Sequence, residues 1–347
     1  MSSQPPIDQM SVLATNSGLL IDDSGSVVVL ISVNEFHDWW NYLESSFESP
    51  IGRKLIYAAS DDEEYFLANN HSYKIPKWFG KNKIIQSMKV RWTSMGWGIH
   101  LPGIRRIQSP CHDSLSAGLG LAHHEHVDQQ RYRMEWRQVH SDLVELDFSK
   151  RMEDIPTAPM ATSPEWVVPI GLADIHTKPH EHEFEPRSFG FFWGQQRSIF
   201  LPTSILHRLF ESIMGRPFNS ERRPREGLHV TGISENPTML FKTLIESSSA
   251  MFGASDYSIF IQNQDDWESH LQHNIRSRGF GDASVEDFAM DEGPKVRMTI
   301  RSPVPTFAIG LMVGMWERAH GSPCMCRVEI SSDLLTVSLY PRSVDYA

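Results

Sequence analysis

Apolar residues recur along the chain in two similar arrangements, each a short apolar strand followed by a helix with one apolar face. In the first, residues 29–31 lead into a helix whose apolar positions are Phe36, Trp39, Trp40 and Leu43. In the second, 170 residues further on, residues 199–201 lead into Leu206, Leu209, Phe210 and Ile213. The i, i+3, i+4, i+7 spacing places each set on one side of a helix. Both arrangements therefore predict a strand that runs into an amphipathic helix.

Two further patterns recur in the same order in both halves of the chain. Ile107-x-Ser109-Pro110 matches Ile300-x-Ser302-Pro303, and a helix of mostly small or apolar residues follows each, at 117–122 and 309–314. A proline at this place is suited to end a strand and open a helix. Residues 134–148 then align with residues 325–339 at a constant offset of 191 without gaps. Both segments predict a strand, a Ser-Asp turn and a second strand.

Three matching patterns in one order indicate an internal duplication of an α/β (α+β) module. Each copy is expected to contain a hairpin strand, two or three helices, a strand, a further helix and a closing hairpin. The expected domains are a disordered N-terminus (1–16), a first module (17–150), a Pro- and His-rich linker (151–187) and a second module (188–342). Extra residues near 262–293 predict a surface insertion in the second module.

Composition and charge narrow the classes of protein. The 347 residues are 40% hydrophobic and 22% charged, a balance typical of folded domains. The formal net charge is −11 and the densest basic stretch, 222–225, is short, which disfavours nucleic acid and anionic membranes as partners. Cys111, Cys324 and Cys326 suggest no disulfide framework. No secretion signal is evident and the longest apolar runs, such as 307–316, are too short to span a bilayer. We expect a cytoplasmic protein.

Two stretches of the first half, together with the strand-to-helix opening of each half, resemble a known family, and the resemblance covers most of both halves. Met95-Gly96-Trp97-Gly98, a strand, Ser109-Pro110-Cys111-His112 and the following helix together resemble the 4-vinyl reductase domain. This domain shares its fold with a class of small subunits of the TRAPP tethering complex. The resemblance implies antiparallel sheets backed by helices, frequent dimerisation and an internal pocket for a small or greasy ligand. Two copies in one chain would then form an internal pseudo-dimer, either as a monomer or within a homodimer.

The sequence departs from the family pattern where some members hold a metal. The second half has Cys324, Cys326 and Glu329, and the alignment places Arg133, Glu135 and Gln138 at the matching positions of the first half. The Cys cluster of those members is incomplete in both halves, so the resemblance implies neither a metal nor another cofactor. The second half also has Val304-Pro305 where Cys111-His112 stand, which favours the first half as the active copy.

Histidine clusters leave metal binding open at two places. The first is His123-His124-x-His126, at the end of the first small-residue helix, and the second is His176, His180 and His182 in the expected linker. Imidazole groups suit zinc. Histidines at a helix C-terminus also interact favourably with its dipole, and a His-rich linker can simply be polar. Cys324 and Cys326 on one strand face are expected to be buried rather than redox-active.

Aromatic and sulfur-containing residues are the candidate ligand contacts. The set expected to line a pocket is Trp40, Trp92, Trp97, Cys111, His112, Met312 and Trp316. Met and aromatic side chains line pockets for apolar ligands, although core packing explains the same residues. Equal loss of ligand binding in Trp97→Ala and Trp316→Ala would contradict the preference for the first half.

No motif compels an enzyme. The chain has no Gly-x-Ser-x-Gly elbow, and Cys111 and His112 are sequence neighbours rather than a catalytic dyad. The acidic run 61–64 predicts a charged, surface-exposed helix start. We therefore expect a non-enzymatic module that binds or senses a hydrophobic or aromatic ligand and acts through a protein partner. The alternatives are a TRAPP-like scaffold or an accessory protein of tetrapyrrole metabolism, in which His100 or His112 would supply a proton.

Overall fold

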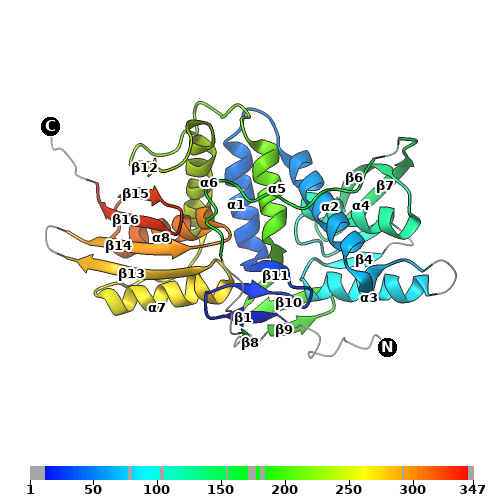
Figure 1. Ribbon diagram of the computed structural model, residues 1–347, viewed down its shortest axis with the longest axis horizontal. Helices are drawn as coiled ribbons and strands as arrows, with labels where there is room; N and C mark the ends of the chain where they lie inside the picture. Colours follow the sequence, from blue (N-terminus) through cyan, green and yellow to red (C-terminus); the bar gives the residue numbers. More distant parts are fainter. Residues whose placement is uncertain are drawn as a thin grey trace.

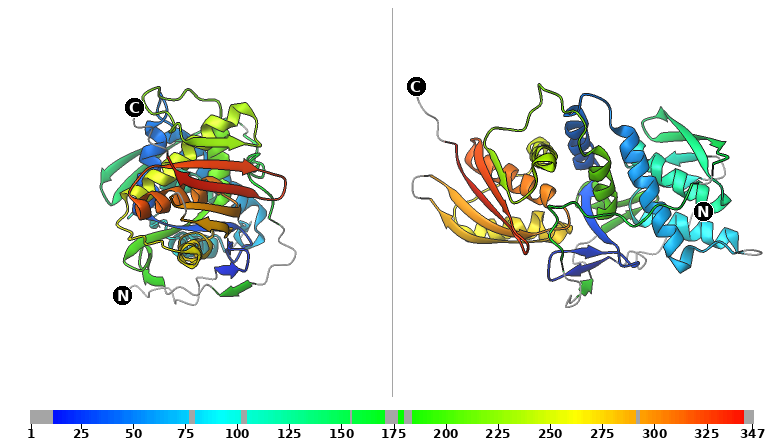
Figure 2. Two further views of the ribbon diagram at one scale, coloured as in Figure 1. Left: turned by 90° about the vertical axis from the view of Figure 1, so that its left-hand side faces the viewer. Right: turned by 45° about the horizontal axis from the view of Figure 1, so that its top comes forward.

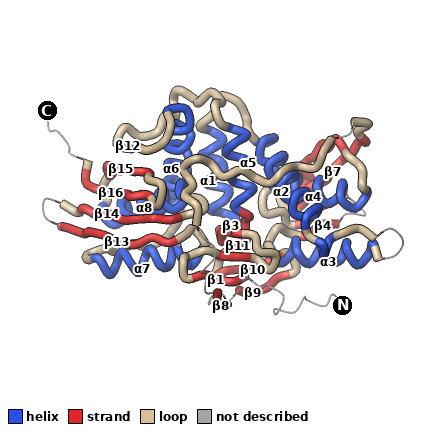
Figure 3. The backbone as a smooth tube through the Cα atoms, in the orientation of Figure 1, coloured by secondary structure: helices blue, strands red, loops and turns tan. Residues whose placement is uncertain are grey.

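The structure is a computed structural model that describes residues 12–76, 80–101, 105–153, 155–170, 177–179, 184–290 and 293–342. It shows a mixed α/β fold in which eight helices of the described part back three sheets that are almost wholly antiparallel (Figures 1 and 3). A seven-stranded sheet lies across the middle of the elongated molecule, and a smaller sheet lies at each end. Within this part, no helix has the length and apolarity that crossing a bilayer requires.

The central sheet contains strands from both halves of the chain. Its order is β8-β1-β2-β3-β11-β10-β9, and all neighbours are antiparallel. The strands are β1 (Leu13–Thr15), β2 (Leu20–Ile21), β3 (Val27–Ser32), β8 (Thr177–Pro179), β9 (Phe184–Arg187), β10 (Gly190–Trp193) and β11 (Gln196–Pro202). In the pairing of β3 with β11, Leu30 lies opposite Phe200, and Ile31 lies opposite Ile199. Leu30 and Phe200 are equivalent at the offset of 170, so the pairing is symmetric about them.

The two end sheets have the same strand order apart from one added strand. The first contains β4 (Ile99–Leu101), β5 (Arg106–Gln108), β6 (Tyr132–His140) and β7 (Leu143–Lys150), in the order β4-β5-β7-β6. The second contains β12 (Leu228–Thr231), β13 (Asp282–Ala289), β14 (Lys295–Arg301), β15 (Cys324–Ile330) and β16 (Leu335–Pro341), in the order β13-β14-β16-β15-β12. β12 is the addition, and it pairs in parallel with β15.

The helices follow the same repeated order. The first half has α1 (Val33–Ser45), α2 (Gly52–Asn69), α3 (Lys81–Ser94) and α4 (Asp113–Asp128), and the second has α5 (Thr203–Ile213), α6 (Glu235–Ala254), α7 (Gln264–Asn274) and α8 (Pro305–His320). Short 3-10 helices follow α2 at His71–Tyr73 and α7 at Arg276–Arg278. The expected apolar faces of α1 and α5 are buried throughout.

The first helix of each half packs against the second helix of the other half. α1 contacts α6 and α5 contacts α2, and the four helices stand side by side in the middle of the molecule (Figures 1 and 2). Trp39 of α1 also packs against Phe307 of α8, with ring centroids 4.8 Å apart. The halves therefore share one continuous hydrophobic core.

Two glycines allow close helix crossings at equivalent places. A Cβ on Gly118 of α4 would lie 2.2 Å from the carbonyl oxygen of Ile56 in α2. A Cβ on Gly310 of α8 would lie 2.5 Å from the carbonyl oxygen of Ile245 in α6. The small-residue helices α4 and α8 thus approach the backbones of α2 and α6, respectively, at these glycines.

The Gly-Trp-Gly segment has a counterpart that the sequence comparison missed. Gly96-Trp97-Gly98 corresponds to Gly279-Phe280-Gly281, and all four glycines have positive φ, between 80° and 111°. A Cβ on Gly96 would lie 2.4 Å from the oxygen of Ser198, and one on Gly279 would lie 2.6 Å from the oxygen of Val28. Val28 and Ser198 are again 170 residues apart. Each half therefore lays this turn on the central strand of the other half.

Three of the expected boundaries are wrong. Residues 13–15 form β1, paired with β2 and β8, so the expected disordered N-terminus does not extend to residue 16. The expected linker contains β9 and the buried Trp166, whose ring lies 5.5 Å from that of Phe241. The expected insertion at 262–293 is α7 and β13, and Trp267 and Phe280 bury completely there. Residues 262–293 thus correspond to α3, the Gly-Trp-Gly turn and β4 of the first half, which also carry buried residues such as Trp92 and Trp97.

The closing hairpins align with one shift that the gapless alignment did not contain. Phe148 pairs with Met134, and its counterpart Leu339 pairs with Cys326. Met134 therefore corresponds to Cys326 and not to Met325. An irregularity near the end of β6 absorbs the extra residue of the first half, which is the usual role of a β-bulge.

Candidate functional site

All seven residues expected to line a pocket lie in the packed interior. Their exposed fractions do not exceed 7%, and the residues are Trp40, Trp92, Trp97, Cys111, His112, Met312 and Trp316. Trp97 donates its ring N–H to the oxygen of Phe200 at 3.0 Å, and His112 packs edge-on against Trp40. None of the seven lines the cleft between the halves or the groove beside β6, both described below. The structure brings them into the core rather than onto a cavity wall.

The histidines weighed as metal ligands or proton donors have other partners. His123 lies 2.9 Å from Glu63, His124 stacks on Phe148, and His126 lies 2.8 Å from the oxygen of Tyr73. No group of three or more His, Cys, Asp or Glu residues in the described part could hold a metal ion. His176, His180 and His182 lie outside the described residues.

His100 and His112 do not suit the role of a proton donor. Burial lowers the pKa of His100 well below its usual value, and burial together with His37 lowers the pKa of His112 to about 3. Both rings are therefore neutral near pH 7. Burial also raises the pKa of Cys111, Cys324 and Cys326, so all three remain thiols.

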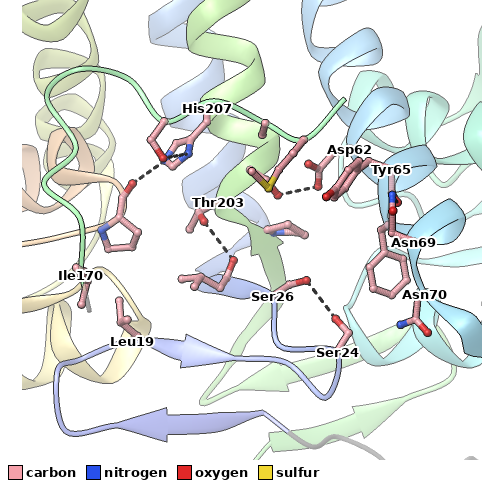
Figure 4. Close-up of a pocket in the computed structure, with 18 of the residues that line it drawn as sticks. Leu19, Ser24, Ser26, Asp62, Tyr65, Asn69, Asn70, Ile170, Thr203 and His207 are labelled. Carbon is pink, nitrogen blue, oxygen red and sulfur yellow. Dashed lines mark hydrogen bonds between the residues drawn. The ribbon is translucent and has the colours of Figure 1, made fainter. Parts of the chain in front are cut away.

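A cleft of about 790 Å³ opens between the two halves on one side of the central sheet. Its walls come from the turn between β2 and β3, from α2, from residues 160–170, from the start of α5 and from Pro303. Figure 4 shows Asp62, Tyr65 and Asn69 of α2 on one side, with His207 and Ile170 on the other. The cleft draws on both halves and on the segment between them.

Asp62 is the acidic group of one wall. Its carboxylate accepts a hydrogen bond of 2.9 Å from the Ser204 hydroxyl and one of 3.1 Å from Nε of Arg208. Burial raises the pKa of Asp62 to about 6, and Ser204 and Arg208 offset this only in part. The carboxyl group therefore changes its charge near neutral pH, and it joins α2 of the first half to α5 of the second.

His207 is a neutral polar group of the opposite wall. Its Nε2 lies 2.7 Å from the carbonyl oxygen of Pro303, which can only accept, so Nε2 carries the proton. Burial lowers the pKa of the ring. The unprotonated Nδ1 is then an acceptor, and it lies 3.5 Å from the Ser163 hydroxyl. This histidine offers a hydrogen-bonding group to the cleft without a charge.

A buried ion network supports the floor of the cleft. Arg91 binds both carboxylate oxygens of Glu63 at 3.2 Å and Asp22 at 3.3 Å. Burial would raise the pKa of Glu63, but Arg91 and His123 outweigh burial and lower it. The guanidinium carbon also lies 3.6 Å from the ring centroid of Phe66, a cation–π contact. Arg91 therefore holds the ring of Phe66 in place at the floor of the cleft, and the Asp22 and Glu63 carboxylates balance its charge.

No protein-family model matches the chain, and no curated protein or solved structure is significantly similar to it.

The cleft residues escaped sequence analysis for two reasons. The run 61–64 is not an exposed helix start, because α2 begins at residue 52 and buries Asp62 and Glu63 in its middle. The available signal was periodicity, since Asp62 falls seven residues after the buried Leu55 and three after Ala59. No local pattern marked Ser204 of α5 as a cleft residue, because its partner Asp62 lies 142 residues away in the chain.

Proposed function

We propose that this protein binds a small molecule in the cleft between its halves and acts as a binding module rather than an enzyme. The cleft of about 790 Å³ carries the proposal, since ligand pockets usually measure about 300–1,000 Å³ and often lie at domain interfaces. A ligand that contacts α2, α5 and residues 160–170 together would bind with an affinity that depends on how the two halves are positioned, and its binding would in turn favour one such position. Such coupling suits a sensor that acts through a partner.

The lining favours a neutral or cationic ligand with an aromatic or apolar part. Phe66, Val168 and Ile170 supply apolar surface, and the acidic residues of the lining are Asp23 and Asp62, of which Asp62 is paired with Arg208. Arg91 is the only lysine or arginine among the described residues that line the cleft, and its charge is already matched. Acidic tetrapyrroles would find no free cation among these residues, which makes that alternative the weaker one.

We also infer that the chain is a duplicated module, resembling the 4-vinyl reductase domain, folded as an internal pseudo-dimer. The repeated element order, the shared strand order of the end sheets and the symmetric pairing about Leu30 and Phe200 support this inference. The reciprocal crossings of Gly96 and Gly279 agree with it. The three free, buried cysteines fit a cytoplasmic location.

The test begins with native mass spectrometry of the purified protein, followed by thermal-shift screening with neutral, cationic and anionic aromatic compounds. Phe66→Ala and the cleft-filling Asn69→Trp are expected to weaken binding at least about tenfold. Tyr57→Ala is the control, because Tyr57 lies on the same helix and is 49% exposed outside this cleft. Binding that Tyr57→Ala weakens while both cleft variants leave it unchanged would refute the assignment, as would a preference for anionic compounds.

A further inference from the structure

A second groove, of about 1020 Å³, runs beside strand β6 and is separate from the cleft. Residues 132–136 of β6 form one wall, and Arg53, Ile56 and Tyr57 of α2 contribute to the other. Among the described residues, β6 pairs only with β7 and ends the sheet. An edge strand of this kind presents unpaired main-chain groups that can accept another strand.

The second half of the molecule shows what fills the equivalent place. There β12 lies parallel to β15, and Cys326 donates its N–H to the oxygen of Gly227 at 2.8 Å. Leu228 of β12 is buried and Val230 is half-buried, whereas His229 and Thr231 are exposed. Met134 of β6 corresponds to Cys326 by its strand pairing, so its N–H faces the groove.

Among the described residues of the first half, no segment pairs with the outer edge of β6. β12 belongs to the connection between α5 and α6, which runs over residues 214–234. The matching connection between α1 and α2 contains only residues 46–51. These six residues lead directly from α1 into α2 and do not reach the outer edge of β6. The connection therefore forms no counterpart of β12 in the groove.

Charge and apolar surface indicate the chemistry of an occupant. The charged residues that line the groove are Arg53, Arg133, Lys150, Arg151, Glu135 and Glu153, which is a net positive set on a chain of net charge −11. Arg53, Arg133 and Lys150 are exposed. The apolar residues Ile56, Leu121 and Trp136 lie in the same groove. Strand addition combines main-chain hydrogen bonds with pockets for alternate side chains.

We propose that this groove binds an extended acidic segment of a partner protein as an added strand parallel to β6. Its apolar residues alternate toward Ile56 and Leu121, as Leu228 and Val230 of β12 do in the second half. Its acidic residues alternate toward the exposed face of β6, which carries Arg133, and Arg53 and Lys150 add positive charge to the groove. This gives the protein a peptide-binding edge independent of the cleft.

The probe is a panel of fluorescein-labelled ten-residue peptides with apolar residues at alternate central positions and Glu or Asp elsewhere. Matched peptides carry Lys in place of the acids. Fluorescence anisotropy is expected to show saturable binding of acidic peptides, at least about tenfold tighter than their Lys counterparts. Hydrogen exchange is expected to slow at residues 132–138 when peptide is bound, because main-chain pairing protects these amides.

Variants separate this groove from other sites. Arg53→Glu combined with Arg133→Glu is expected to weaken binding about tenfold. Arg327→Glu is the matched control, since Arg327 is exposed on β15, whose edge β12 already covers. Phe66→Ala in the cleft is expected to leave peptide binding unchanged.

Three outcomes overturn the proposal. The first is the absence of saturable binding across the panel, and the second is binding that leaves exchange at β6 unchanged. The third is a dimer in light scattering that Trp136→Asp dissociates, which would assign the edge to a second copy of this chain.

Discussion

The helix crossing at Gly118 offers a direct test of how α4 packs on α2 within the first half. In Gly118→Ala, the new Cβ would lie 2.2 Å from the Ile56 carbonyl oxygen and 2.9 Å from the Ala59 Cβ, closer than real Cβ contacts allow. Helices α2 and α4 would have to separate by about 1 Å. Overpacking of this severity costs about 3–4 kcal/mol, whereas alanine gains about 1 kcal/mol of helix propensity. We expect a net loss of about 2–3 kcal/mol in the free energy of unfolding.

Two further glycines give the matched comparison. Gly310→Ala is expected to lose a similar amount, because its Cβ would lie 2.4 Å from the Ser248 Cβ. Gly253→Ala, in α6, has nothing within 4 Å and is expected to gain about 0.5–1 kcal/mol. Urea unfolding followed by circular dichroism measures all three, with m unchanged from the parent protein. Equal midpoints for Gly118→Ala and the parent, or an equal loss in Gly253→Ala, would refute the reasoning.

Three further predictions concern buried charges and thiols. Arg278 binds the buried Glu35 carboxylate at 2.7 and 3.0 Å, so Arg278→Met leaves that charge buried without its partner. We expect the free energy of unfolding in urea to fall by about 3–5 kcal/mol, and to recover in part when Glu35→Gln is added. A fall of less than about 1 kcal/mol would contradict this. The pKa of Asp62 is about 6 in the folded protein and 3.8 ordinarily, so protonation of Asp62 stabilises the folded state. This contribution to the free energy of unfolding is complete below pH 3.8 and is lost as the pH rises through 6. Relative to Asp62→Asn, the parent protein should therefore lose up to about 3 kcal/mol between pH 4 and 7.5, and a constant difference would refute the assignment. All three cysteines should resist iodoacetamide until urea unfolds the chain, and mass spectrometry that finds rapid labelling of the native protein would contradict their burial.

Much of the element order was predictable from local patterns. The helix period identified α1 and α5, and the proline and small-residue motifs identified the starts of α4 and α8. The partner of each strand was not predictable, because an apolar run such as that of β3 signals burial without naming its neighbour. The match of Gly279-Phe280-Gly281 to Gly96-Trp97-Gly98 was also hidden, since phenylalanine replaces tryptophan and the surrounding loops differ in length.

The cleft was less predictable than the fold. Trp92, Trp97 and Trp316 drew attention because large aromatic residues stand out, but such residues fill cores more often than they line pockets. The cleft instead combines Asp62 with Ser204, two residues that touch only because α2 packs on α5. No local pattern encodes a contact across that separation.

The pairing of β3 with β11 also has a consequence for synthesis of the chain. β3 exposes four apolar residues, 28–31, until its partner strand has been made about 170 residues later. A ribosome adds about 5–20 residues per second, so β3 waits for roughly ten to thirty seconds. β2 is made earlier and can cover the other edge of β3, but an apolar strand with one open edge is prone to aggregation during such an interval. The edge of β3 that pairs with β11 therefore stays open until residue 202 has been added to the chain.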